Sequence, residues 1–145
     1  MELSPHRIRL WELIESTPCL DWSLLTKRPQ NVESMVPWGD QWPLNVWLGT
    51  TVENQTFADK RLPFLLKNPA MVRFLSCEPL LGSLDLSPWF RKKGLHSIDW
   101  VIAGGESGPS SRPTHPDWAA SILHQCQRAK VPFHFKRWGH WVPAG

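Results

Sequence analysis

The sequence contains no tyrosine, only three cysteines and no long run of apolar residues. Cys19, Cys77 and Cys126 are odd in number, far apart and outside any CxxC spacing, which argues against a disulfide scaffold and a local zinc or iron–sulfur motif. The six histidines lack HxH and HExxH spacing, which argues against a zinc site, and we assign no metal-binding residues. Because no apolar run reaches about 18 residues, we expect no membrane-spanning helix.

The first 18 residues are amphipathic and charged, and they lack the apolar block and small-residue cleavage site of a secretory signal. We therefore expect a cytoplasmic location. A length of 145 residues, with 41% hydrophobic and 20% charged residues, is typical of one soluble globular domain. We predict a single α/β domain over 1–145, with residues 139–145 as a tail.

Short apolar segments alternate with helical patterns along the chain. A cap residue starts each expected helix: Ser4, Asn54 and Thr114. Pro63 lies inside the second helix and should kink or split it. Strands are expected over 20–26, 45–52, 72–76, 99–105 and 131–135. Such alternation predicts the α/β class, with a parallel sheet of about five strands and alternating helices.

Each predicted strand ends in polar residues. Crossover connections bring the carboxyl ends of parallel strands to one edge of the sheet, where ligand sites of α/β proteins form. We therefore expect a shared site at this edge. The polar residues at the strand ends are Lys27, Arg28, Glu53, Asn54, Cys77, Glu78, Glu106, Ser107 and Lys136.

The chemistry of these residues leaves several interpretations open. Three carboxylates facing two or three cations can bind a charged small molecule, hold a divalent ion, or supply an acid–base pair. They can equally form a structural ion-pair network. We assign the catalytic candidates as Glu53, Glu78 and Lys136, and the substrate-binding candidates as Lys27, Arg28 and Asn54.

The fourth predicted strand ends in a glycine-rich loop. Its glycines leave backbone N–H groups free to approach a ligand, although a tight turn is the alternative interpretation. The loop matches neither GxGxxG nor the P-loop pattern. The cofactor-binding candidates are Gly104, Gly105, Glu106 and Ser107.

Five blocks together resemble a known family. They are LLTKRP at 24–29, VWLGTTVENQ at 46–55, RFLSCEPLLG at 73–82, IDWVIAGGESG at 98–108 and PFHFKRWG at 132–139. The chain resembles, from about residue 22 to 141, a phage and prophage gene-product family carried as a domain of unknown function. Full-length members of that family look like radical S-adenosylmethionine proteins.

The resemblance implies part of a TIM-type barrel and S-adenosylmethionine as a candidate cofactor. Full-length relatives carry an N-terminal cysteine-rich segment expected to bind a four-iron cluster. None of the three cysteines here stands in that motif, so we expect no iron–sulfur cluster on this chain alone. In radical S-adenosylmethionine enzymes a Gly-Gly-Glu motif lies near the second strand, whereas Gly104-Gly105-Glu106 comes late in this chain.

These observations favour the substrate-binding half of a radical S-adenosylmethionine-like barrel, catalytically incomplete alone. Five strands fall short of a closed eight-stranded barrel, so we expect self-association or a partner chain that completes it. One alternative is a nucleic-acid-binding or nucleic-acid-modifying protein, which the net charge of +3 permits. Its motivating residues are Lys27, Arg28, Arg91, Lys92, Lys93, Trp38 and Trp42. The other alternative is an inactive truncated remnant that still folds.

Overall fold

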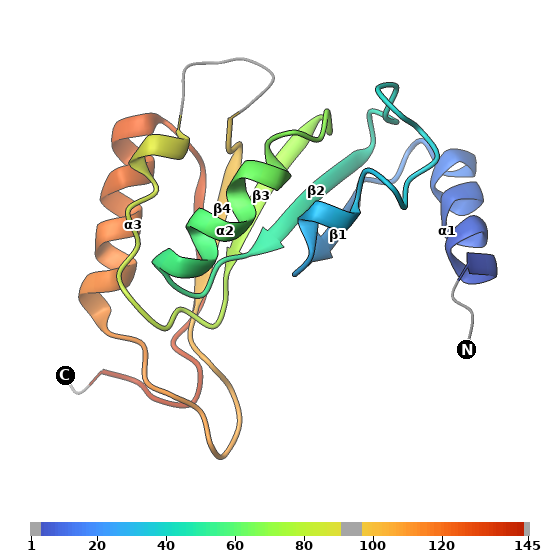
Figure 1. The fold of residues 1–145 in the computed structure, drawn as a ribbon. Helices are drawn as coiled ribbons and strands as arrows, with labels where there is room; N and C mark the ends of the chain where they lie inside the picture. The colour runs from blue at the N-terminus through green and yellow to red at the C-terminus, as the bar shows by residue number, and fades with distance from the viewer. Residues whose placement is uncertain (1–3, 91–96, 144–145) are drawn as a thin grey trace.

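The chain forms a five-stranded sheet in which neighbouring strands are parallel and follow chain order (Figure 1). The structure is a computed structural model that describes residues 4–90 and 97–143. The strands are β1 (Trp22–Thr26), β2 (Val46–Thr51), β3 (Val72–Cys77), β4 (Trp100–Gly104) and β5 (Phe133–Arg137). The predicted α/β class and all five predicted strands are confirmed.

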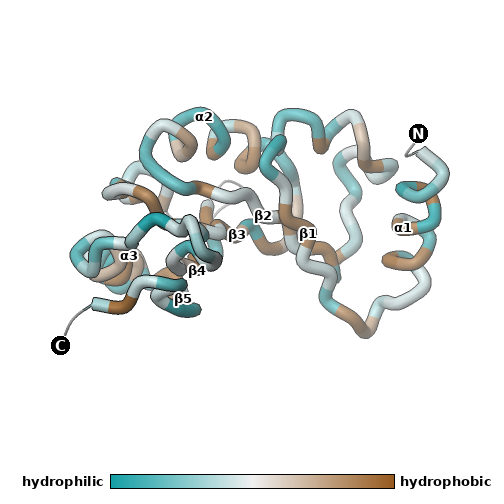
Figure 2. The backbone as a smooth tube through the Cα atoms, turned by 90° about the horizontal axis from the view of Figure 1, so that it is seen from below, coloured by the Kyte–Doolittle hydropathy of each residue, from teal (hydrophilic) through white to brown (hydrophobic). Residues whose placement is uncertain are grey.

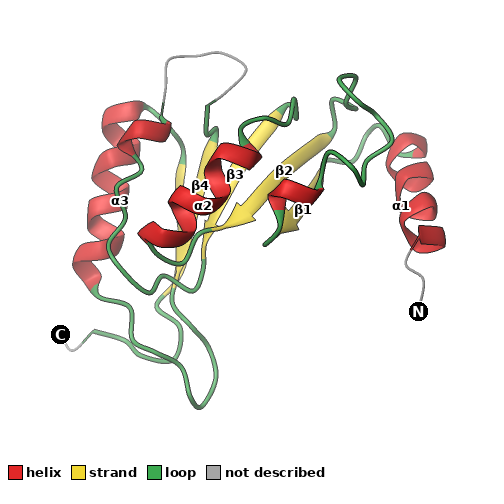
Figure 3. Ribbon diagram, viewed as in Figure 1, coloured by secondary structure: helices red, strands yellow, loops and turns green. Residues whose placement is uncertain are grey.

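Three α-helices accompany the sheet (Figure 3). They are α1 (Ser4–Ser16), α2 (Gln55–Leu65) and α3 (Pro116–Ala129), with short 3₁₀ turns η1 (Pro29–Asn31) and η2 (Ser87–Trp89). Viewed along the strands, the sheet is an arc with α2 and α3 on its convex side and α1 beyond β1 (Figure 2). Right-handed crossovers between parallel strands in chain order place the connecting helices on one face, which accounts for this arrangement.

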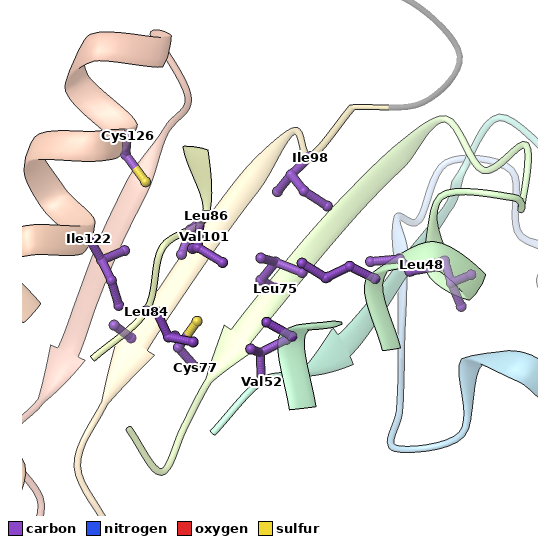
Figure 4. Packing of buried hydrophobic residues seen from close by; sticks show 14 of the residues in the cluster. Leu48, Val52, Leu75, Cys77, Leu84, Leu86, Ile98, Val101, Ile122 and Cys126 are labelled. Carbon is purple, nitrogen blue, oxygen red and sulfur yellow. The ribbon is translucent and has the colours of Figure 1, made fainter. Parts of the chain in front are cut away.

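The main core lies between the convex face of the sheet and the helices (Figure 4). Alternate strand residues point to this side, among them the fully buried Leu75 and Val101. Leu62 of α2 and Ile122 of α3 pack in the same cluster and are also fully buried. Burial of each such side chain stabilises the fold by about 1.5–3 kcal/mol, so this face holds the sheet together.

The concave face of the sheet carries apolar residues that no helix described here covers (Figure 2). Leu25, Gly49, Phe74 and Trp100 align across four neighbouring strands. Leu25 is 51% exposed, although it lies within a strand. The concave face of the sheet is therefore open at β1.

Two local expectations are corrected. Thr114 is not the cap of α3: His115 is, and its Nδ1 accepts a hydrogen bond from the Asp117 N–H. The Thr114 hydroxyl instead donates to the Leu80 carbonyl at 2.9 Å, because the loop turns into the protein there. Pro63 does not split α2, which continues to Leu65; its missing N–H removes one helical hydrogen bond, the one that would reach the Asp59 carbonyl.

Among residues 4–90 and 97–143, no helix has both the length and the apolar character needed to cross a bilayer.

Gly49 is required by close packing on the concave face. A Cβ at this position would lie 2.4 Å from the ring of Phe74, which covers the β2 backbone. We expect Gly49→Ala to lower the free energy of unfolding by about 1–3 kcal/mol, because the added methyl group overpacks the site. Urea unfolding measures this. In a Phe74→Leu background the same substitution should cost less, and an equal cost in both backgrounds would contradict the assignment.

Candidate functional site

The polar residues at the strand ends lie at one edge of the sheet, but their side chains form three separate ion-pair groups. The groups centre on Glu53, Glu78 and Glu106. Each carboxylate has its own cationic partners. The predicted gathering of charge at this edge is therefore present, and its division into three groups was not apparent from the sequence.

Glu53 is a buried carboxylate that joins β1, β2 and α2. Its Oε1 accepts from Lys27 Nζ at 3.0 Å, and its Oε2 accepts from Arg61 Nη1 at 2.6 Å. Arg61 also donates to the Thr51 carbonyl at 2.9 Å, and its guanidinium lies over the Phe57 ring. Glu53 is 6% exposed. Arg61 was not among the predicted site residues, because the sequence does not show whether a single arginine within a helix points inward.

The pKa of Glu53 reflects opposing effects. Burial disfavours the charged form and by itself would raise the pKa. The hydrogen bond from Lys27, a backbone hydrogen bond and the positive charges of Arg61 and Lys27 outweigh that effect, so the pKa lies below its ordinary value. Glu53 is therefore ionised at neutral pH, as an ion-pair partner must be.

Glu78 holds two consecutive cations of β5. Its Oε2 accepts from Lys136 Nζ at 3.1 Å, and its Oε1 accepts from Arg137 Nε at 3.2 Å. Sequence analysis identified Glu78 and Lys136 but missed Arg137. Successive residues of a regular strand point to opposite faces, so regular alternation would direct Arg137 away from Lys136.

A β-bulge explains how both cations reach the same carboxylate. Ala103 pairs with Phe135, but the next residue, Gly104, pairs with Arg137 and skips Lys136. The extra residue disrupts the alternation of side chains locally. As a result, Lys136 and Arg137 both approach Glu78.

A pocket opens on the concave face beside this bulge, with a volume of about 350 Å³. It has apolar residues from β1, β3 and β4 and polar residues near the carboxyl ends of β3 and β5. Its lining residues are Leu25, Phe74, Ser76, Glu78, Ile102, His134 and Lys136. We call it the concave pocket.

Ser76 and His134 are concave-pocket residues that sequence analysis did not select. Ser76 lies two residues before Glu78, and His134 lies two residues before Lys136. Because strand residues two apart share a face, extending the alternation back from each predicted residue would have found both.

Glu106 is bound to Arg112 of its own loop. Its carboxylate accepts from Arg112 Nη2 at 2.7 Å, from Arg112 Nε at 2.9 Å and from the Arg112 backbone N–H at 2.8 Å. These hydrogen bonds, with the guanidinium charge, lower the pKa of Glu106 to about 2. Sequence analysis did not select Arg112.

The glycine-rich loop packs against the segment that follows β5. The Gly105 N–H donates to the Arg137 carbonyl at 2.9 Å, so it is not free for a ligand in the way the sequence suggested. A Cβ on Gly105 would lie 1.7 Å from the Trp138 carbonyl oxygen, so only glycine fits there. The Gly105 N–H and the Glu106 carboxylate, two of the groups expected to contact S-adenosylmethionine, are thus engaged within the protein. We derive no chemistry through this cofactor.

The other candidate residues have separate surroundings. The Asn54 side chain accepts from the Phe57 N–H and caps α2. Arg28 and Ser107 are exposed. Gly104 is buried beside the Glu78 carboxylate. Substrate binding by Asn54 and Arg28, and cofactor binding by residues 104–107, stay predictions.

The cysteines do not form a cluster-binding set. Cys77 and Cys126 are buried in the main core (Figure 4), whereas Cys19 is exposed. Burial raises the pKa of Cys126 to about 12 and raises the pKa of Cys77 further. Thiolates are the metal-binding form of cysteine, so these buried thiols are poor ligands. Within the described ranges, no three His, Cys, Asp or Glu side chains are grouped to hold a metal.

The two cations on Glu53 should contribute unequally to stability. The Arg61 side chain is 10% exposed and the Lys27 side chain is 62% exposed. We expect Arg61→Met to lower the free energy of unfolding by about 3–5 kcal/mol, because it removes a buried partner of a buried charge. Lys27→Met should cost less than about 1 kcal/mol, because an exposed ion pair is screened by water. Equal losses in urea unfolding would contradict this division.

Glu53 should also contribute to acid sensitivity. Because its pKa is lowered in the folded state, ionised Glu53 stabilises the fold above its unfolded pKa of about 4.5. That contribution is lost as pH falls through the lower folded pKa. Free energies of unfolding measured from pH 7 to pH 3 should therefore fall less steeply in Glu53→Gln than in the unmodified chain. Glu12→Gln, at an exposed position on α1, is the matched control and should leave the slope unchanged.

Comparison with known proteins places the chain in a family. A family model described as "protein of unknown function (DUF5131)" matches residues 4–145. No curated protein and no solved structure matches the chain. The family's description names no activity, so the phage origin and the relation to radical S-adenosylmethionine proteins stay predictions. The chain belongs to the DUF5131 family of proteins of unknown function.

Proposed function

We propose that this chain is the substrate-binding half of an α/β barrel that resembles radical S-adenosylmethionine proteins, and that a second copy or a partner chain completes the barrel. The observation that carries the proposal is the open concave face, with a pocket where the strands reach their carboxyl ends. In α/β barrels that face is the interior, and that end forms the active site.

The order of the strands supports this reading. Parallel strands in chain order, with α2 and α3 on the convex side, make up the repeating unit of a barrel. Eight strands close such a barrel, and this sheet has five. Among the described residues, β1 and β5 each have a strand neighbour on one side only, so either edge can accept a further strand.

The polar groups of the concave pocket supply the binding and proton-transfer chemistry of the proposal. Glu78 and Lys136 lie 3.1 Å apart at the pocket wall and can exchange a proton with a bound substrate. Glu53 does not line this pocket. We therefore assign Glu53 to holding β1, β2 and α2 together, and Glu78 with Lys136 to the site.

The proposed half-barrel does not initiate radical chemistry alone. The described cysteines do not suit an iron–sulfur cluster, and this holds equally for a second copy of the chain. The proposal therefore assigns cluster binding to a partner chain of different sequence. Anaerobic reconstitution with iron and sulfide tests this division. A stable four-iron cluster on this chain alone would contradict it.

Nucleic-acid binding has less support at the residues that suggested it. Trp38 contacts Trp11 and Trp42 edge-on and donates from Nε1 to Glu15 Oε1 at 2.7 Å. Trp42 is buried. These contacts pack α1 against the 36–42 loop, which accounts for the two rings without a nucleic acid. Residues 91–93 lie outside the described residues, and no observation favours the inactive-remnant alternative.

Self-association tests barrel completion by a second copy. We expect light scattering after size-exclusion chromatography to show a dimer or larger species at micromolar concentration. Leu25→Asp, on the open concave face, should shift the population towards monomer. Leu13→Asp, at a similarly exposed position on α1, should not. A clean monomer of the unmodified chain would rule out completion by a second copy.

A further inference from the structure

The cations at the end of β5 have more hydrogen-bonding capacity than Glu78 uses. An ammonium has three N–H donors and a guanidinium has five. Lys136 Nζ makes one hydrogen bond to Glu78, and Arg137 donates to Glu78 from Nε alone. Their side chains are 49% and 52% exposed. Donors of both cations therefore remain available to a ligand.

We propose that the concave pocket binds a ligand that carries a carboxylate or phosphate group on a flat apolar body, with the anionic group on Lys136. This inference rests on the proposed function, because it names the substrate class of the same pocket. Lys136, Arg137 and Glu78 together leave a net positive charge of one at the polar end of the pocket. That charge favours an anion over a neutral or cationic group.

The β-bulge is part of the construction of this site. Alternation from His134 already places Lys136 in the pocket wall, and the bulge brings Arg137 to the opposite oxygen of Glu78. Arg137 thereby shares the negative charge that would otherwise neutralise Lys136. Without the bulge, alternation would send one of the two cations to the far face of the sheet. In this arrangement Arg137 is a positioning residue that acts through Glu78, and Lys136 contacts the ligand.

Ser76 adds a second polar group to the wall of the concave pocket. It is 6% exposed and lines the concave pocket. Its backbone carbonyl accepts from the Val52 N–H, but its hydroxyl makes no hydrogen bond to the residues the structure describes. A hydroxyl can donate and accept a hydrogen bond, so the Ser76 hydroxyl is suited to a ligand oxygen at this wall of the pocket.

The apolar wall of the pocket indicates the shape and polarity of the uncharged part of the ligand. Leu25, Phe74 and Ile102 form this wall, and the Phe74 ring lies 5.8 Å from that of Trp100. Apolar walls favour an aromatic or similarly flat group, and they strengthen a charge contact at their edge by excluding water. A volume of about 350 Å³ is near the lower limit for small-molecule pockets and suits a ligand with a single ring or two fused rings.

Titration calorimetry with 2-naphthoate and 2-naphthamide tests the inference on the unmodified full chain. The two probes share the apolar body and differ in charge. We expect 2-naphthoate to bind at least tenfold more tightly than 2-naphthamide, with an affinity that falls as salt is added. 2-Naphthyl phosphate, measured in parallel, shows whether a phosphate or a carboxylate is preferred, and tighter binding of either anion than of the amide supports the proposal.

Variants locate the interaction. Lys136→Met should weaken 2-naphthoate binding at least tenfold while leaving 2-naphthamide binding within a factor of two. Lys136→Arg should restore most of the affinity, and Ser76→Ala should weaken it about threefold. Lys60→Met, which removes an exposed cation from α2, is the matched control and should change nothing. Urea unfolding checks that each variant is folded, and Lys136→Gln replaces Lys136→Met if that variant is not.

The outcomes separate the two proposals. Equal binding of 2-naphthoate and 2-naphthamide, with both lost in Leu25→Asp, would overturn the anion inference and leave the substrate pocket standing. Undiminished binding of 2-naphthoate to Lys136→Met and Lys136→Gln would overturn the assignment of the anion to Lys136. Absence of binding by all three probes would overturn the inference and count against the pocket itself.

Discussion

The structure depends on one constraint: each strand pairs in parallel with the strand that precedes it in the chain. Parallel neighbours need a crossover, and right-handed crossovers in an unbroken order return on the same side of the sheet. The helices α2 and α3 therefore share the convex face with the main core, and the concave face is left open. The same constraint directs every strand's carboxyl end to one edge, where the charged residues lie.

The charged residues at that edge differ in role because their surroundings differ. Glu53 is enclosed by Lys27, Arg61 and Thr51, which use both of its oxygens and join three elements. Glu106 is bound to Arg112 within a single loop. Glu78 lies in the wall of a pocket, and its two partners keep unused donors. The ion pairs of Glu53 and Glu106 thus stabilise the fold, whereas those of Glu78 shape a candidate site.

Apolar and polar surfaces meet in the concave pocket in a way that suits a small ligand. Phe74 lies over Gly49 and lines the apolar part, while the bulge at Lys136 brings a second cation to its edge. The exposed Leu25 lies in the same wall and at the edge strand β1. The proposed ligand site and the proposed surface for barrel completion therefore adjoin each other, and a completing chain would enclose the ligand.

Much of the fold followed from the sequence by itself. Alternation of apolar strands with helical segments specified the α/β class and all five strands, because side-chain periodicity and the hydrophobic effect act locally along the chain. The carboxyl-end rule correctly placed Glu78 and Lys136 at one edge. The sequence did not predict which acceptor the Thr114 hydroxyl chooses. Thr114 has the residue type of a helix cap, but its hydroxyl donates to the Leu80 carbonyl, which is 34 positions away.

Only the tertiary structure decided which charges meet. The sequence predicted that three carboxylates share one site, but each of them pairs with a different arginine: Arg61, Arg112 or Arg137. Ion pairing depends on the direction of the side chains and not on their spacing along the chain. The bulge that aims Arg137 arises from a register shift between β4 and β5, which no pattern within β5 reveals. The sequence determined where the strands end, and packing across strands determined that Glu78, Lys136, Ser76 and His134 share a pocket while Glu53 and Glu106 do not.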